Sequence, residues 1–339
     1  MLRDCSHEDR LSNLLRIVIT KRDNLRALNG GFSVLGGSAT CHVESPEDRV
    51  ALNKLNKAYT KLIRTPSKRA SFHAWMEKFM GRQKAHEHEA FLALWLSKYL
   101  FASVKNTISP ETFQLAILLA RGQRIAMAPA VLATLCRDLH ILQDAILDVQ
   151  EEVTDMILQE VFSPMYYIQV WVLERFPCVR PRDSHGTRSG ETRLARWAGL
   201  NNKITYFSTL ESGTKKEHFV WRPYVNDTDH FIAHKVYNEN ESFRNIDNEE
   251  LESFARCLRV CKLVGLDTNQ HYYPHRVCRQ FGYAQDIPAD ILQVESNEDA
   301  WVDYSTPLST GTVYVPSRES EGHVTVRNLG SSGEESWRI

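Results

Sequence analysis

The sequence predicts a mainly α-helical globular domain of several helices, with a minor β component near its C-terminus. Two patterns lead to this fold class: helix-start signals followed by apolar residues at helical spacing, and one long apolar stripe that recurs every three or four residues. The chain has 339 residues, of which 42% are hydrophobic and 24% charged. This composition is typical of globular proteins and excludes a wholly disordered or fibrous chain.

Three helices are predicted in the first 125 residues. Ser45 can cap a helix whose first turn holds a proline and two acids, and apolar residues then recur at helical spacing to position 62. Residues 85–101 are apolar on nearly every side in their later part, which predicts a buried core helix. Ser109-Pro110-Glu111 repeats the first start signal, and Gly122 closes that third helix.

The longest predicted helix follows Pro129 and carries a near-heptad apolar stripe. From residue 138 to 160 it has seven acids and no lysine or arginine. Two interpretations stay open, a long core helix with a solvated face or a coiled-coil seam for a partner. The stripe consists of Leu132, Leu135, Leu139, Leu142, Ile146, Val149, Val153 and Ile157.

Further helices are predicted at 166–176, ending at Pro177, and at 249–264, where Cys261 belongs to the apolar side and Gly265 stops the helix. Another helix is expected to run from Pro274 to Phe281. After residue 301 the sequence is strand-like or loose. We divide the chain into a leader with a glycine-rich turn (1–45), a helical part (46–176), a basic linker (177–220), a C-terminal part (221–310) and an irregular tail (311–339).

Charge and hydropathy bound the cellular context. Forty-one basic and 42 acidic residues give a net charge of −1, so no global attraction to nucleic acid or membrane follows. No apolar run reaches the ~18 residues of a membrane span, and the N-terminus lacks the apolar core of a signal peptide. An intracellular protein without membrane contact is expected, and its seven scattered cysteines are expected to be reduced thiols.

One segment is locally basic. Residues 177–222 hold nine basic and four acidic residues. A solvated basic loop is the simpler interpretation, and a contact to nucleic acid phosphates is the alternative. The candidate contact residues are Arg180, Arg182, Arg188 and Arg193.

The sequence predicts no metal, cofactor or catalytic site. Cys257-x3-Cys261 followed by His271-x3-His275 superficially resembles a zinc site, but the gap between the pairs is short and the cysteines belong to an apolar stripe. His86 and His88 point about 200° apart on a helix, which indicates a surface patch rather than a shared ion. The chain lacks the motifs of a serine nucleophile elbow, a phosphate-binding loop and a dinucleotide fold.

Seven segments together resemble the plant mobile domain family. In chain order they are 29–36 (NGGFSVLG), 71–80, 87–97, 119–133 with 137–139, 171–177, 219–224, and 273–282 with 285–288. Family members usually have a further helical stretch before the glycine turn and a Trp-Trp pair near the end. Neither has a clear copy here, so we expect the N-terminal part of the fold to be missing.

The resemblance implies a nuclear plant protein connected with transcription, silencing of transposable elements and meristem maintenance. It also implies a phosphatase-like nuclear protein as partner. Although the family is sometimes labelled aminotransferase-like, no pyridoxal-phosphate signature is present. The leading hypothesis is therefore a non-enzymatic nuclear scaffold, and the alternative is a transposon-derived module that binds DNA or chromatin.

The shared motifs suggest structural roles for most of their residues. Trp95, Trp171 and Phe176 are expected to bury large areas, while Arg175 and Arg222 are suited to stacking on aromatic rings. A polar string near the C-terminus is the best candidate for a functional surface, with a buried hydrogen-bond network as the other interpretation. It comprises His275, Arg276, Arg279, Gln280, Gln285 and Asp286.

Overall fold

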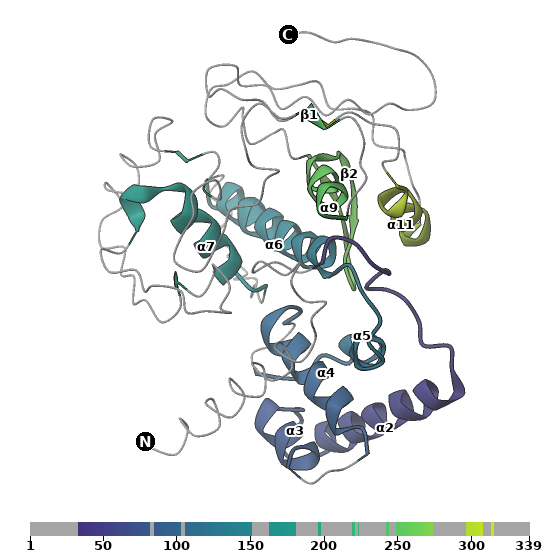
Figure 1. Ribbon diagram of the computed structural model, residues 1–339. Coiled ribbons are helices and arrows are strands. Elements are labelled where there is room, and N and C mark those ends of the chain that lie inside the picture. Colours follow the sequence, from purple (N-terminus) through teal and green to yellow (C-terminus); the bar gives the residue numbers. More distant parts are fainter. Residues whose placement is uncertain are drawn as a thin grey trace.

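The computed structural model describes residues 33–81, 85–102, 106–150, 163–180, 196–197, 219–220, 223, 242–243, 249–273, 296–307 and 313–314. This part of the chain is mainly helical, as the sequence predicts, with short strands in the C-terminal third (Figure 1). In order, the elements are α2 (Pro46–Ile63), α3 (Phe72–Phe79), α4 (Glu87–Tyr99), α5 (Thr112–Ala120), α6 (Met127–Gln150), α7 (Tyr166–Arg175), η2 (Pro177–Val179), β1 (Ser242–Phe243), α9 (Glu249–Leu258), β2 (Cys261–Val264), β3 (Asn269–Tyr272), α11 (Asn297–Ser305) and β4 (Val313–Tyr314).

Helices α2 to α5 pack around one apolar core, with α4 against α5 and α2 against both α3 and α5 (Figure 1). Ser45 caps α2 by accepting a hydrogen bond from the amide of Asp48, which confirms the predicted start. Helix α4 is buried nearly all round, as predicted. Helix α5 follows the predicted start signal at 109–111, and Gly122, with a φ of +80°, lies just beyond its end as predicted.

Trp75 lies at the centre of this core. Its side chain is fully buried and stacks on Phe113, with ring centroids 5.4 Å apart. The indole Nε1 donates a 2.9 Å hydrogen bond to the carbonyl of Ala90, so the polar atom of the ring is satisfied inside the core. A single side chain therefore joins α3, α4 and α5.

The glycine-rich turn pairs with the segment that precedes α6. The amide of Gly37 donates to the carbonyl of Arg124 at 2.8 Å, and the amide of Ala126 donates back to Gly37 at 2.9 Å. Gly36 has a φ of +142°, and a Cβ there would lie 2.7 Å from the carbonyl oxygen of Arg124. Only glycine fits a backbone approach this close.

Helix α6 leaves this junction and runs along the middle of the molecule (Figure 1). Its first part is buried, including Val131 and Leu135, but the predicted stripe does not stay buried. Leu139 is 43% exposed and Leu142 is 38% exposed. The core thus uses only the N-terminal part of the stripe among the described side chains, and residues 151–162 lie outside the description.

The predicted helix 249–264 is wrong in its second half. Helix α9 ends at Leu258, and Cys261–Val264 forms strand β2, which pairs antiparallel with β3. Gly265 begins the connecting turn, where its amide donates to the carbonyl of Thr268 at 2.7 Å. The hairpin packs on α6 and against α11, a helix that occupies positions predicted to be loose after residue 301.

Helix α7 confirms the short aromatic helix and carries a separate apolar cluster with Phe176, Val179 and Trp197. Trp171 was expected to be buried, but it is 37% exposed and its ring is covered by the Arg175 guanidinium at 4.8 Å. Stacking on the cation replaces burial at this position. Trp95 is half-buried, and Arg222 lies outside the described residues.

No helix within the described ranges is long and apolar enough to cross a membrane. The five segments into which the sequence divides the chain remain a prediction, because most of 177–220 and the tail fall outside the description.

The close approach at Gly36 predicts a large effect of one methyl group. Gly36→Ala should lower the free energy of unfolding by about 2–4 kcal/mol, because the new Cβ collides with backbone atoms that cannot move aside. Gly81→Ala is the matched control, since Gly81 has a φ of +74° but no atom within 4 Å of its Cβ position. It should cost only about 1 kcal/mol. Urea denaturation measures both, and equal losses would contradict the collision.

Candidate functional site

Helix α2 has two sharply different faces. Ala51, Leu55 and Ala58 are buried in the core. An exposed flank of the helix carries Lys54, Lys57, Lys61 and Arg64, which recur at spacings of three, four and three and so form one stripe along the helix. All four are exposed, and we call them the α2 cationic stripe.

The stripe belongs to a longer stretch of unbalanced charge. Residues 49–70 contain seven lysines and arginines and no acid. Besides the stripe these are Arg49, Lys68 and Arg69, which are exposed too. The acids of α2, Glu47 and Asp48, are confined to its first turn, where they stabilise the positive end of the helix dipole.

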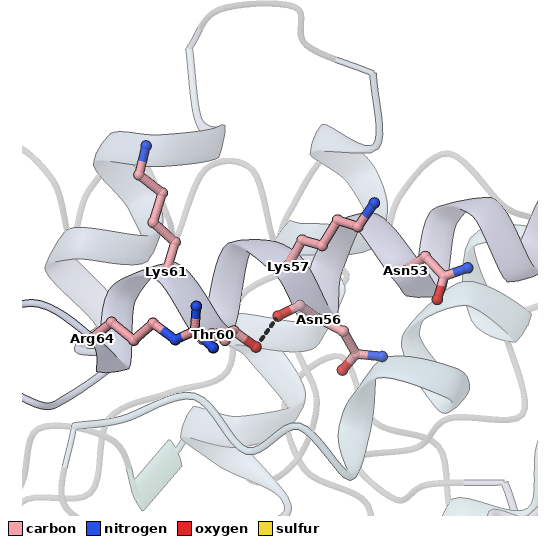
Figure 2. Close-up of a pocket in the computed structure, with 6 residues that line it drawn as sticks. All are labelled: Asn53, Asn56, Lys57, Thr60, Lys61 and Arg64. Atoms are coloured by element: carbon pink, nitrogen blue, oxygen red, sulfur yellow. Dashed lines mark hydrogen bonds between the residues drawn. The ribbon is translucent and has the colours of Figure 1, made fainter.

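The stripe cations have no ion-pair or hydrogen-bond partner among the described residues. Figure 2 shows Lys57 and Lys61 extending away from the helix above a shallow surface hollow of roughly 370 Å³. Asn53, Asn56 and Thr60 line the same hollow, and Thr60 donates its hydroxyl to the carbonyl of Asn56 at 2.8 Å. The hollow is therefore edged by cations and neutral hydrogen-bonding groups.

Neighbouring like charges make this stripe costly to the free protein. Cations three or four residues apart on a helix repel by about 0.2–0.5 kcal/mol per pair. Several arginines elsewhere in the described part are paired: Arg137 with Asp138 and Asp267, Arg256 with Glu252, and Arg259 with Asp303. The α2 stripe is thus a surface suited to a polyanion.

An ion-pair cluster fixes α2 to the helices behind it. Arg121, at the end of α5, bonds Asp48 of α2 at 2.8 Å through Nε and Glu89 of α4 at 2.9 Å through Nη1. Both carboxylate side chains are largely buried, at 12% and 8% exposure. His86 lies at the start of α4 with Nδ1 3.5 Å from Glu89, so it joins this cluster rather than a surface patch.

The cluster controls the ionisation of Glu89. Burial by itself would raise the pKa of this carboxyl group, but its own backbone amide, the hydrogen-bonded Arg121 guanidinium and the nearby His86 ring outweigh burial and lower the pKa below its ordinary value. Glu89 therefore stays charged inside the fold. The charge in turn keeps Arg121 in place against Asp48.

Comparison with protein families gives one match. The model of the family described as plant mobile domain covers residues 24–329, nearly the whole chain. The chain belongs to the plant mobile domain family. No protein of curated function and no solved structure matches it.

Two of the plant mobile domain motifs meet in the structure. The glycine turn of the first motif and residues 124–126 of the motif at 119–133 form the backbone pairing described above. Arg121 of that same motif holds the ion-pair cluster. These motif residues therefore assemble the fold. The α2 cationic stripe lies between motifs, at 54–64, and our sequence analysis missed it, although a count of charges in a sliding window reveals it.

The predicted nucleic-acid contacts are placed only in part. Arg180 donates from Nε to the carbonyl of Leu173 at 2.6 Å and also bonds the carbonyl of Glu174, so it caps the C-terminal end of α7. It also lies over the Trp197 ring, 6.0 Å from its centroid. Arg182, Arg188 and Arg193 lie outside the described residues.

The predicted polar string, residues 275–286, lies wholly outside the described residues. Among the acids at 138–160, which could pair with the arginines of such a string, Asp138 is already engaged. Arg137 bonds its Oδ1 at 2.8 Å, and the amide of Ser163 bonds its Oδ2 at 3.0 Å. Burial alone would raise the pKa of Asp138, but these hydrogen bonds lower it overall.

The residues that superficially resemble a zinc site are described only in part, because His275 lies outside the described residues. Cys257 ends α9 while Cys261 lies on β2 beside Tyr272, whose hydroxyl donates to the carbonyl of Cys257 at 2.8 Å. Burial raises the pKa of the Cys261 thiol to about 12, which keeps it protonated at neutral pH. Among the described residues no three histidines, cysteines or acids are grouped to hold a metal ion.

The lowered pKa of Glu89 predicts how the stability of the fold changes as the pH falls. Its contribution to stability is complete above the ordinary pKa of 4.5 and is lost as the pH falls through the lower pKa of the folded state. Glu89→Gln should cost about 1–3 kcal/mol at pH 7 and should flatten the fall in stability below pH 4.5. Thermal melts between pH 7 and pH 3 measure both effects.

Glu77→Gln supplies the control for that series. Glu77 is 70% exposed and lies 3.8 Å from His73, so this surface pair contributes little. Its melting curves should follow those of the wild type at every pH. If Glu89→Gln also kept the wild-type acid dependence, Glu89 would not be the group that titrates.

Proposed function

We propose that this plant mobile domain protein is a non-enzymatic nuclear scaffold that acts in the silencing of transposable elements, in transcriptional regulation and in meristem maintenance. Membership of the family over residues 24–329 is the observation that carries the proposal. The partner that this function requires is a phosphatase-like nuclear protein.

The ion pairs that connect separate helices support a scaffold role. Arg121 joins three helices, Arg137 joins α6 to the β2–β3 turn, and Arg259 bonds Asp303 near the end of α11. The buried Arg256 likewise donates to the carbonyls of Tyr304 and Ser305, which places positive charge at the negative end of that helix. These ionic groups hold helices at fixed positions, as a rigid platform for partners requires.

The polar string at 275–286 is the proposed partner surface. Arg276 and Arg279 carry its positive charge, and arginine is well suited to pairing with carboxylates across an interface. A buried hydrogen-bond network is the competing interpretation. The two differ in what a truncation does: a buried arginine stabilises the fold, whereas an interface arginine stabilises only the complex.

Affinity purification from plant nuclei tests this function. The full chain should recover a phosphatase-like protein, and the variant Arg276→Ala/Arg279→Ala should lose it while melting within about 2 °C of the wild type. If the pair is buried instead, the free energy of unfolding should fall by about 1–3 kcal/mol for each truncation. Arg182→Ala/Arg193→Ala is the control bait, with the same two charges removed elsewhere, and it should keep the partner.

Two outcomes would count against the scaffold proposal. Recovery of nucleic acid without a protein partner would favour the DNA-binding alternative. A fluorescent fusion of the full chain that stays outside plant nuclei would contradict the nuclear location.

A further inference from the structure

We propose that the α2 cationic stripe binds the phosphate backbone of double-stranded DNA without reading its sequence. The inference goes beyond the scaffold function and rests on different residues, Lys54, Lys57, Lys61 and Arg64. It also differs from the sequence-based alternative, which placed nucleic-acid contact in the segment 177–222.

The spacing of the stripe matches a regular polyanion. Ten residues separate Lys54 from Arg64, so the four cations extend over about 15 Å of a straight helix. Duplex DNA carries one negative charge for every ~1.7 Å of its axis. That figure counts both strands, so one strand carries a phosphate for every ~3.4 Å of axis. A helix of this length laid along one backbone therefore meets about four phosphates, one for each cation of the stripe.

Positive charge is denser in residues 49–70 than in the basic segment 177–222 that the sequence analysis selected. Residues 49–70 carry seven cations and no acid, whereas 177–222 dilutes nine cations with four acids over twice the length. In addition Arg180 is engaged with backbone carbonyls at the end of α7. The stripe cations, in contrast, have no partner in the described part of the chain.

The neighbouring side chains favour a duplex over a single strand. Proteins that bind single strands stack bases on exposed aromatic rings. The only aromatic residue in 49–70 is Tyr59, which packs against the core with its ring 6.1 Å from that of Phe113. Asn53, Asn56 and Thr60 beside the stripe supply neutral hydrogen-bonding groups, which commonly contact phosphate and sugar oxygens.

The apolar face of α2 argues against a membrane surface as the occupant. An interfacial helix inserts its apolar face between lipid headgroups. Most apolar residues of α2 are committed to the core, where Ala51 and Leu55 have no exposed area, and the 53% exposed Val50 is a single side chain rather than a face that could insert. Only charge and hydrogen bonds are therefore available to a ligand.

Fluorescence anisotropy with a labelled 20-base-pair duplex of mixed sequence tests the proposal on the full chain. Each phosphate contact contributes about −0.9 to the slope of log K against log salt, so four contacts predict a slope of about −3.6. Lys54→Gln/Lys57→Gln/Lys61→Gln should reduce the steepness of this slope by about 2.7. The same variant should still recover its protein partner from nuclei, which separates this proposal from the scaffold function.

Arg182→Gln/Arg188→Gln/Arg193→Gln is the matched control, because it removes the same three charges from the sequence-predicted segment. It should bind the duplex as the wild type does. Neither variant should melt below the wild type, because the α2 variant loses only repulsion between cations. An unchanged slope in the α2 variant, or loss of binding in the control alone, would overturn the assignment. So would tighter binding to a single strand of the same length than to the duplex.

The acidic segment 138–160 of a second copy of the chain is the other anionic surface that could bind the stripe, because it carries seven acids. Sedimentation at low salt distinguishes it. A dimer that the α2 variant abolishes, together with no binding of the duplex, would overturn the DNA proposal.

Discussion

The ion-pair cluster around Arg121 determines which way α2 faces. Its guanidinium bonds one carboxylate on α2 and another on α4, and its backbone amide closes the end of α5, so one residue ties three helices together. The two carboxylates are largely buried, and removing the cation would leave two uncompensated negative charges in the interior. Because Asp48 is held at the start of α2, the helix is fixed in rotation as well as in position. Its apolar side then lies over Phe113 and Trp75, and the cationic stripe faces solvent. A buried electrostatic contact thus creates an exposed electrostatic surface.

The motifs that identify the family are explained largely by assembly. The turn at Gly36 and Gly37 requires a close backbone approach to residues 124–126, and Arg121 lies only three residues before that pairing. One short stretch of chain therefore anchors the glycine turn, the ion-pair cluster and the start of α6. Residues with such linked roles tolerate little change for physical reasons. The surface of α2 has no comparable constraint from packing, so its run of cations calls for an explanation outside the fold.

Local signals predicted most helices correctly, because caps and periodicity act over a few residues. Ser45, Gly122 and the all-round apolar segment of α4 are examples. The errors arose where contacts between residues far apart in the sequence determine the local structure. Apolar spacing continues past Leu258, yet Cys261–Val264 forms a strand, because the folded chain places β3 beside it. Leu139 fits the apolar stripe, but its side chain remains 43% exposed among the described residues. The α2 cationic stripe was not predicted because the search for a site considered motifs with histidines and cysteines. The net charge of −1 also gave no sign that seven cations lie together at 49–70.

A nearly neutral protein can nonetheless present a strong local field. At physiological ionic strength charges are screened over about 8 Å, so a ligand on α2 responds mainly to charges within that distance. The nearest acid on the same face is Glu47, which precedes Lys54 by two helical turns, or about 10 Å, while successive stripe cations are three or four residues apart. A phosphate backbone on this face therefore meets cations before it meets any acid of the helix. Global charge balance prevents long-range attraction but leaves short-range binding intact. Such a surface therefore holds DNA through close phosphate contacts, which weaken steeply with salt, rather than through long-range attraction.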